Sequence, residues 1–513
     1  MHHALTISEI IHEIFSYLPE PDIHSLNVAH KRSAGYTTLT ALAVTCRSFR
    51  ESALALRWRR LRGIRPLIPL FPRDIWQEYN PGDYDPNELD LDFGRLPSKE
   101  EWICFESYTS RIREIHINMR AFEGVVNVMA TLSMKYANAS ECHLFPNLQT
   151  LTWYSQEKTE LPFAHLFFLP SLCCLTLRFD GFDGRRAPGL LLLLEHQYPR
   201  LKQFNISGFF CSRNILELRA FQQLESLDCD EIDESALGYL AKLATLKDLS
   251  FYLRDPIPSS VVFNEGFVNL QTLSITADEI SAAVSFLLST QLSLKSIHIA
   301  IIGRRQPLLS TSLQQLFSRV STGLCHTRLT QIHLLRSDSC PQDESLDIAA
   351  LRPLFSFSKL RYVHIDGLCL FDLSDDTLVE LADTWPHLEE LELNYGSGWG
   401  RTSKITFKGL KSLIRACPLL QTLALAIDAT QLNVVSSTTP GEDIHNDNIE
   451  TLNLEDSIIE NPAAVALILG ELFCSLKEVQ VDFYSRRGLY GRLWSEVNSH
   501  LLKRRANKQE IGL

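Results

Sequence analysis

Hydrophobic positions along the chain recur in one short motif, in which an apolar residue is followed by a second one three positions later and a third two positions after that. Residues 147–153 (NLQTLTW) and 171–177 (SLCCLTL) are clear copies. The alternation at the end of each copy is typical of a β-strand with one buried face. Fourteen copies occur at a mean spacing of 28 residues, with their first apolar residues at Ile112, Leu148, Leu172, Leu201, Leu224, Leu246, Leu270, Leu294, Leu329, Leu360, Leu388, Leu420, Ile449 and Leu476.

Between the copies the hydrophobic period changes to about 3.6 residues, which predicts amphipathic helices over residues 376–382 and 409–415. A strand plus a helix at a period of 20–29 residues is the signature of a leucine-rich repeat. We therefore expect an α/β leucine-rich-repeat solenoid, a horseshoe with parallel strands on its concave face and helices on its convex face. Coincidental leucine spacing in a generic α/β domain is the alternative, and fourteen successive copies argue against it.

The N-terminal residues 5–61 follow a different pattern and form a small all-α module of three expected helices, at 6–18, 38–49 and 51–61. Thr6 and Glu9 form the signature of a capping box at the start of the first helix. Three short helices bury little apolar surface by themselves, so such a module usually needs a partner surface.

The rest of the chain divides into three further parts. Residues 62–97 are rich in proline and acidic residues and are interpreted as a linker with irregular structure. The solenoid is assigned to residues 98–483 and starts with a capping helix, which Ser98 and Glu101 announce. Residues 484–513 are expected to form a C-terminal capping helix and a basic tail, with four apolar residues against the last repeat: Leu493, Trp494, Val497 and Leu501.

Composition and charge narrow the setting in which the protein acts. The net charge of −12 gives no basic footprint for nucleic acid. Twelve scattered cysteines without a CxxC pair indicate a reducing compartment. No secretory signal pattern is evident, and the longest apolar runs are far shorter than the roughly 18 residues of a membrane span. We expect a soluble intracellular protein, in the cytoplasm, the nucleus or both, with no contact to a membrane.

Motifs for catalysis, cofactors and metals do not emerge. The phosphate-binding GxxxxGK[ST] pattern and the HExxH and GxSxG patterns do not occur. The alternating glycines at 396–400 follow a repeat strand and are interpreted as a flexible loop rather than a nucleotide site. Cys142–His143 and Cys173–Cys174 lack a second pair at zinc spacing. We expect no cofactor, no metal and no catalytic residue, and an enzyme on a solenoid is the least favoured class.

Residues 9–18, 39–49 and 54–61 resemble an F-box, and together with the leucine-rich array the chain resembles the fungal F-box/leucine-rich-repeat family. The resemblance implies a substrate-recognition subunit of an SCF-type cullin-RING E3 ubiquitin ligase. The F-box would bind the Skp-family adaptor, the repeats would bind a substrate protein, and ubiquitin chemistry would take place on the conjugating enzyme. The alternative is a non-catalytic leucine-rich-repeat scaffold that acts outside ubiquitin transfer.

The same resemblance implies that the apolar residues of the N-terminal module form the adaptor interface or support it. The simpler reading is that they form only the core of a small helical domain. Asp in place of Ile14 or Phe15 is expected to disconnect the adaptor. The residues concerned are Ile7, Ile10, Ile11, Ile14, Phe15, Leu18, Leu42, Val44, Phe49 and Trp58.

Strand positions that alternate with the buried ones are expected to face the concave surface and hold the substrate. Among these positions ten are acidic and only Arg178 is basic, which predicts a partner with a basic segment, although sampling or a habit of the repeat family would give the same excess. The acidic residues are Glu114, Asp228, Asp230, Asp248, Asp366, Glu390, Glu392, Glu455, Glu478 and Asp482.

Three consecutive repeats carry histidine at the central outward position: His298, His333 and His364. Neighbouring parallel strands lie about 4.8 Å apart, so these side chains are expected to form a ladder on the substrate-binding surface. Stacked imidazoles disfavour simultaneous protonation, whereas Asp366 and Glu392 nearby favour it. Three readings stay open: neutral polar residues on a binding surface, a sensor of pH between about 5 and 7, or ligands for zinc.

Overall fold

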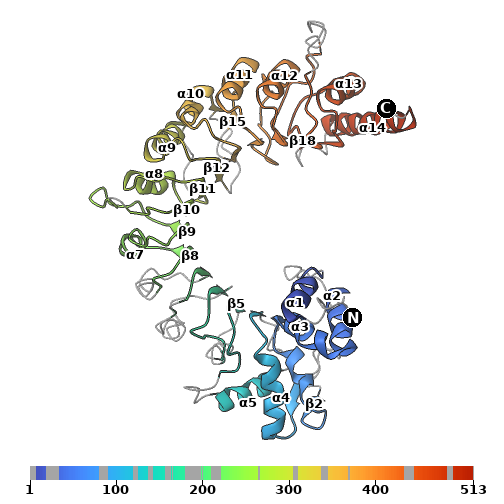
Figure 1. Cartoon of the computed structure of the whole chain (residues 1–513). Helices are drawn as coiled ribbons and strands as arrows, with labels where there is room; N and C mark the ends of the chain where they lie inside the picture. Colours follow the sequence, from blue (N-terminus) through green and yellow to red (C-terminus); the bar gives the residue numbers. More distant parts are fainter. Residues whose placement is uncertain are drawn as a thin grey trace. The chain divides into compact units, whose positions relative to one another are not determined.

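The computed structural model divides the chain into two compact units, Met1–Asp230 and Glu231–Leu513, which are described in turn (Figure 1). The residues that the structure describes are 7–18, 34–79, 90–118, 125–136, 143–155, 163, 166–179, 198, 200–208, 221–263, 266–303, 310–336, 345–367, 370–432, 444–481 and 489–511.

The first unit starts with the three expected helices, α1 (Ser8–Ser16), α2 (Ala34–Thr45) and α3 (Arg47–Arg57). Both α1 and α2 pack against α3. The second and third helices begin four residues earlier than predicted, and Cys46, in extended conformation, separates them. The expected capping box of α1 is wrong, because Ile7 occupies the N-cap position and makes no side-chain cap. Thr6 lies outside the described residues.

Residues 62–97 are a packed part of the first unit, so their interpretation as an irregular linker is wrong for the described residues. They contain the end of β1 (Arg60–Arg62), the 3-10 helix η2 (Arg65–Leu70), and the antiparallel pair β2 (Trp76–Tyr79) and β3 (Asp90–Phe93). Phe71 stacks on Phe105 of α4 (Lys99–Thr109), with ring centroids 4.5 Å apart. Five apolar side chains of this segment are buried: Ile64, Leu67, Ile68, Phe71 and Ile75.

The main architectural element is a parallel sheet of 15 strands, so the fold is α/β and compatible with the expected solenoid. Hydrogen bonds connect the strands in the order in which they occur in the chain. The strands that follow β1 are β4 (Glu114–Ile117), β5 (Thr150–Ser155), β6 (Cys174–Phe179), β7 (Gln203–Ser207), β8 (Ser226–Glu231), β9 (Asp248–Leu253), β10 (Thr272–Ala277), β11 (Ser296–Ile301), β12 (Gln331–Arg336), β14 (Tyr362–Asp366), β16 (Glu390–Leu393), β17 (Thr422–Ala424), β18 (Thr451–Asn453) and β19 (Glu478–Gln480).

All fourteen strands that the motif predicts are confirmed, and each begins two residues after the first apolar residue of its copy. Their registers align the copies: Leu273 pairs with Ile297, and Ile297 pairs with Ile332. The alternation is visible in the burial, because the apolar residues are buried and the residues between them are half-buried or exposed. We call the surface formed by these intervening residues the open face of the sheet.

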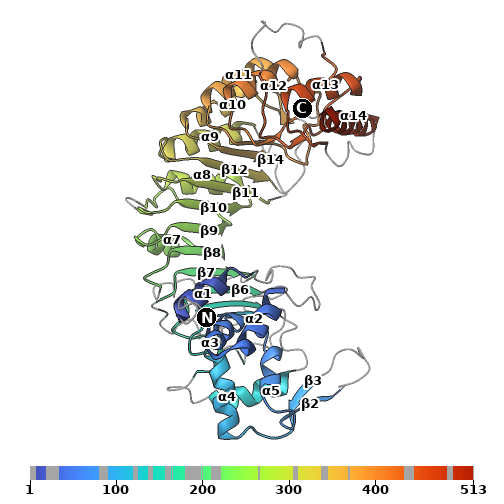
Figure 2. The same ribbon diagram turned by 45° about the vertical axis from the view of Figure 1, so that its right-hand side comes forward.

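Helices accompany both parts of the sheet. In the first unit, α4 starts with the predicted capping box of Ser98 and Glu101, and α5 (Val126–Tyr136) follows. In the second unit the helices run along one side of the strands (Figures 1 and 2). They are α7 (Glu234–Leu240), α8 (Ile280–Leu288), α9 (Ser310–Gly323), α10 (Ile348–Leu351), the 3-10 helix η7 (Arg352–Ser356), α11 (Asp375–Thr384), α12 (Phe407–Ala416) and α13 (Pro462–Leu472); a short pair, β13 (Ser345–Leu346) and β15 (Leu370–Phe371), lies among them.

The predicted C-terminal capping helix is confirmed as α14 (Leu489–Ile511), which contacts the last strand, β19. Trp494, Val497 and Leu501 are buried. Asn498 donates to the carbonyl of Val479 and accepts from its N–H, both at 2.8 Å. Because these backbone groups lie on the final strand, α14 covers an edge that would otherwise be open to pairing with another chain.

Candidate binding surfaces

The N-terminal helices enclose a small core of their own. Ile11, Phe15, Leu39 and Ala53 are buried in it, and the rings of Phe15 and Phe49 meet edge to face with centroids 5.4 Å apart. Leu18 and Leu42, from the predicted adaptor set, pack against this core while partly exposed. These residues therefore support the module from within.

Helix α1 also has a second apolar face, which points away from this core. Ile10, Ile14 and Tyr17 are 39%, 49% and 81% exposed, and Ile7 at the N-cap is 37% exposed. At 100° per residue, Ile10, Ile14 and Tyr17 lie within an arc of about 60°. We call Ile7, Ile10, Ile14 and Tyr17 the α1 stripe.

The structure thus divides the predicted adaptor residues into two groups. Ile7, Ile10, Ile14 and Val44 are exposed, and Val44 lies on α2. The other members are buried or half-buried, and Trp58 makes an edge contact with Tyr108 at 5.4 Å. Tyr17 was missed by the sequence reasoning, although its spacing of three residues from Ile14 was a usable signal.

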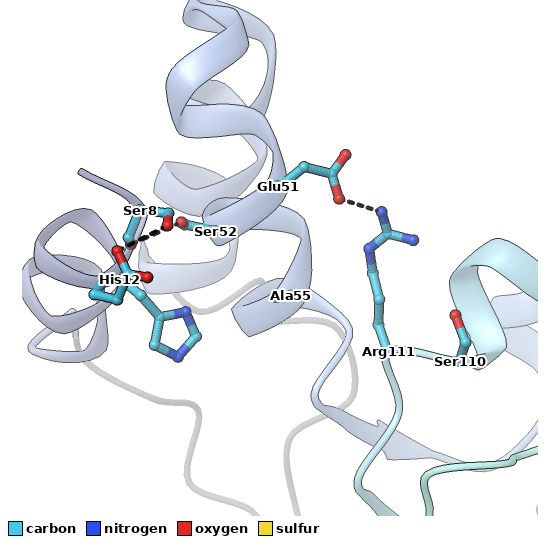
Figure 3. A pocket seen from close by; sticks show the side chains of 8 residues that line it. Ser8, His12, Glu51, Ser52, Ala55, Ser110 and Arg111 are labelled. Carbon is cyan, nitrogen blue, oxygen red and sulfur yellow. Dashed lines mark hydrogen bonds and ion pairs between the residues drawn. The ribbon is translucent and has the colours of Figure 1, made fainter. Parts of the chain in front are cut away.

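An open pocket of about 620 Å³ lies beside the same helices (Figure 3). The lining is mostly polar and consists of Ser8, Glu9, His12, Glu51, Ser52, Ala55, Ser110 and Arg111. Arg111 and Glu51 form an ion pair at 2.6 Å across it, which ties α3 to the turn after α4. Ser52 donates to the carbonyl of Ser8 at 3.3 Å and fixes α1 to α3. The pocket therefore lies at the joint between the helical module and the first strands.

The predicted histidine ladder is confirmed on the open face in the second unit. The register pairs His298 with His333 and His333 with His364. The rings of His298 and His333 are stacked, with centroids 4.3 Å apart and planes 4° from parallel, and the third ring meets His333 edge-on at 5.3 Å. Nε2 of His298 is buried and has no hydrogen-bond partner among the described residues.

Three carboxylates surround the distal end of the ladder. His364 lies between two of them, with Nε2 3.0 Å from Glu390 Oε2 and Nδ1 3.6 Å from Glu392 Oε2. Nε2 of His333 is 3.9 Å from Asp366 Oδ2. A neutral imidazole carries only one N–H, so His364 can donate to one of its two carboxylates at a time. We call His298, His333, His364, Asp366, Glu390 and Glu392 the His–carboxylate cluster.

The electrostatics of the cluster disfavour charge on both kinds of group. Burial, and then the neighbouring His298 and His364, lower the pKa of His333 to about 4, and burial lowers the pKa of His298. Burial also raises the pKa of Asp366 to about 6, with Glu392 adding to the effect, even though the N–H of Tyr395 bonds one of its oxygens at 2.7 Å. The pKa of Glu392 is raised by burial and by Glu390.

The other predicted substrate residues lie apart from this cluster. Asp228 is exposed on β8 and accepts a hydrogen bond from Asn205 at 2.6 Å, and Asp230 is half-buried on the same strand. Asp248 is half-buried on β9, in register with Thr272. These three aspartates are therefore separate acidic positions of the open face.

The prediction of ten acidic residues on the open face is only partly right. Glu455 is fully buried, and Glu114 is paired with Arg60 and His116, both at 2.8 Å. Asp482 lies outside the described residues. The alternation that predicted Glu455 breaks down because this residue adopts a positive φ of 48°.

The glycine-rich loop after β16 is held by carboxylates rather than flexible. Glu455 accepts hydrogen bonds from the N–H groups of Gly396 and Gly398, at 3.0 and 3.2 Å. Asp456 accepts from Trp399 and Gly400, at 2.8 and 2.6 Å. Successive backbone N–H groups of this kind form an anion-binding nest, and here the protein's own carboxylates fill it. The expectation of a flexible loop is therefore wrong, and the donors that a phosphate would need are engaged.

Among the described residues, no helix is both long enough and apolar enough to cross a membrane. Compared with models of known protein families, the sequence matches none of them, and a comparison with curated proteins finds no match either.

Proposed function

We propose that this chain is the substrate-recognition subunit of an SCF-type cullin-RING ubiquitin ligase. In this proposal the N-terminal module is an F-box that binds a Skp-family adaptor, and the sheet belongs to a leucine-rich-repeat solenoid that binds the substrate protein. Ubiquitin transfer takes place on the conjugating enzyme, so the proposal assigns no catalytic residue to this chain.

The observation that carries the adaptor part is the α1 stripe. Ile11 and Phe15 already satisfy the module's own core, yet Ile10, Ile14 and Tyr17 present a second apolar row to solvent. An apolar row on a short helix is how helix-in-groove partners are recognised. Burying a whole Ile side chain contributes about 1.5–3 kcal/mol, so covering the exposed half of Ile14 contributes about 1 kcal/mol.

The His–carboxylate cluster supports the substrate part. Burial keeps His333 neutral at neutral pH, whereas Glu390 and Glu392 carry the acidic charge. A Lys or Arg side chain of a partner would relieve the repulsion between these carboxylates and would accept the hydrogen bonds' geometry that His364 leaves free. The cluster therefore suits a substrate with a basic segment, and a surface of one sign also steers the approach of an oppositely charged partner.

Co-expression with a Skp-family adaptor and a cullin tests the proposal. The wild type is expected to capture both proteins, and Ile14→Asp is expected to capture neither. Ile103→Asp is the matched control, because Ile103 is a similarly exposed isoleucine, on α4 at 58% exposure. Capture of the adaptor without the cullin would favour a scaffold outside ubiquitin transfer. Failure of the wild type to capture the adaptor would refute the F-box assignment.

A further inference from the structure

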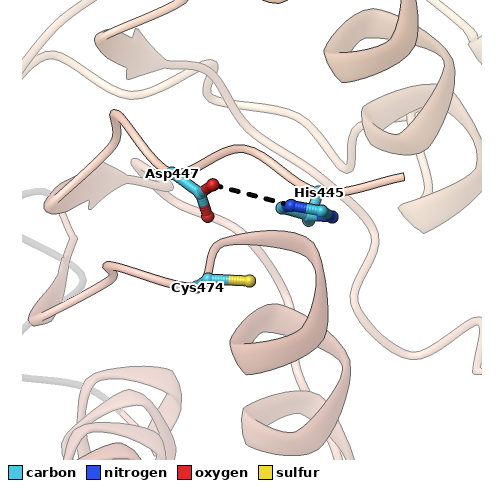
Figure 4. A group of neighbouring side chains, drawn as sticks. All are labelled: His445, Asp447 and Cys474. Atoms are coloured by element: carbon cyan, nitrogen blue, oxygen red, sulfur yellow. Dashed lines mark ion pairs between the residues drawn. The ribbon is translucent and has the colours of Figure 1, made fainter. Parts of the chain in front are cut away.

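A second cluster of potential ligands lies in the second unit, away from the His–carboxylate cluster in sequence. His445, Asp447 and Cys474 each present one donor atom, and these atoms all lie within 4.8 Å of one another (Figure 4). Nε2 of His445 is 3.5 Å from Oδ2 of Asp447. Among the described residues, no other group of three His, Cys, Asp or Glu side chains meets this distance. All three residues are exposed, so an ion can reach them from solvent.

The backbone beneath the three side chains is fixed by several hydrogen bonds. Asn446 is buried, and it forms a parallel bridge with Phe473 that joins the two segments. The N–H of Asn446 donates to the carbonyl of Leu472 at 2.8 Å, and the N–H of Cys474 donates to the carbonyl of Asn446 at 3.2 Å. The Asn446 side chain adds a bond of 2.8 Å to the carbonyl of Leu420. Cys474 is therefore held beside the 445–447 segment by the main chain.

The inward direction of Asn446 explains why its two neighbours converge outside. In extended backbone, alternate side chains point to opposite sides. Because Asn446 points into the protein, His445 and Asp447 point outward together, toward the side on which Cys474 is exposed. The arrangement requires only rotation of side chains to bring the three donor atoms closer.

The donor set fits one class of ion. An imidazole nitrogen, a carboxylate oxygen and a thiolate sulfur are the ligands of zinc, at about 2.0–2.3 Å from the metal. A tetrahedron of that size has edges of about 3.3–3.7 Å, and the His445–Asp447 separation of 3.5 Å already lies in this range. Three protein ligands leave one position open for water or for a donor from a partner.

We propose that His445, Asp447 and Cys474 form a surface site for a divalent transition metal of the zinc class. Binding would release the thiol proton of Cys474 to solvent, because the thiolate is the ligand. The proposal is independent of the proposed function, since it depends only on these residues and on the main chain between β17 and β19.

Titration of the full-length chain with Zn²⁺ after treatment with a chelator tests the site. We expect one zinc equivalent to bind, and Cys474→Ser to weaken that binding by about tenfold or more, since even the outer partners of metal ligands contribute that much. Cys104→Ser, which removes another exposed cysteine, is the matched control and should bind zinc like the wild type. His445→Ala should weaken binding in the same way as Cys474→Ser.

Cobalt gives an independent readout of the sulfur ligand. Co²⁺ bound by a thiolate shows a charge-transfer band in the near ultraviolet, and this band should appear with the wild type and with Cys104→Ser but not with Cys474→Ser. Circular dichroism of each variant checks that the fold is retained. Absence of zinc binding, zinc binding that Cys474→Ser leaves unchanged, or a cobalt spectrum without the thiolate band would each overturn the proposal.

Discussion

The His–carboxylate cluster makes a specific prediction about stability and pH. His333 has a pKa of about 4 in the folded protein against an ordinary value of 6.5, so its protonation favours the unfolded chain. Stability is therefore lost as the pH falls from 6.5 toward 4. Asp366 has a pKa of about 6 against an ordinary value of 3.8, so its protonation favours the folded chain. Stability is gained as the pH falls from 6 toward 3.8, and the two effects oppose each other.

The magnitudes follow from these shifts. Between pH 7 and pH 5, the His333 shift lowers the free energy of unfolding by about 2 kcal/mol, and the Asp366 shift raises it by about 1 kcal/mol. The His333 side chain is 30% exposed, and solvent screening reduces its contribution to about 1 kcal/mol. The two contributions therefore nearly cancel in the wild type.

Single substitutions are expected to reveal the contributions that cancel. Urea unfolding at pH 7 and pH 5 measures the free energy of unfolding of the wild type, His333→Asn, Asp366→Asn and the double variant. Relative to the wild type, acidification should stabilise His333→Asn by about 1 kcal/mol and destabilise Asp366→Asn by about 1 kcal/mol. The double variant should return to the pH dependence of the wild type. If both single variants followed the wild type, or if their order were reversed, the account of the cluster would be wrong.

Three further predictions concern the parts that hold the two units together internally. Glu455→Ala removes the acceptor of two backbone N–H groups in the glycine-rich loop and should lower the free energy of unfolding by about 3–5 kcal/mol in urea, more than Glu455→Gln does; equal stability of the Ala variant and the wild type would contradict the clamp. Asn498→Ala uncovers the edge of β19, so amide hydrogen exchange at Val479 should accelerate, and an unchanged exchange rate would show that α14 covers the edge without this side chain. Phe15→Ala should cost about 3–5 kcal/mol through a cavity in the N-terminal module, whereas Ile14→Ala should change stability by less than about 1 kcal/mol; a larger loss for Ile14→Ala in thermal unfolding would place the core on the wrong face of α1.

Most of the sheet could be predicted because a repeat array applies the same pattern many times, so that one uncertain copy is supported by its neighbours. The strand that was missed shows the limit of this approach. In β1, Trp58 stands where the other copies have Leu or Ile, and Gly63 replaces the third apolar residue, as the pairing of Leu61 with Ile115 shows. The copy therefore did not match the motif, although its backbone joins the same ladder.

The errors in the non-repeating parts have physical causes too. The prolines of residues 62–97 suggested irregular structure, but Pro66 and Pro69 lie in the 3-10 helix η2, whose apolar side chains are buried. For Glu455, alternation predicted an exposed side chain, and the positive φ turned it into the core. The zinc-class cluster was not predicted, because Cys474 lies 27 residues after Asp447 and only the bridge at Asn446 brings them together.

Binding of a purified Skp-family adaptor to the purified full-length chain is the most direct test of the proposed function. Ile14→Asp removes about 1 kcal/mol of apolar contact and places an unpaired carboxylate in the interface, at a cost of about 3 kcal/mol or more. Titration calorimetry should therefore show tight binding to the wild type and to Ile103→Asp, and about 1,000-fold weaker binding to Ile14→Asp. If the wild type did not bind the adaptor, or if Ile14→Asp bound it as tightly as Ile103→Asp does, the assignment of the α1 stripe as an adaptor surface would be contradicted.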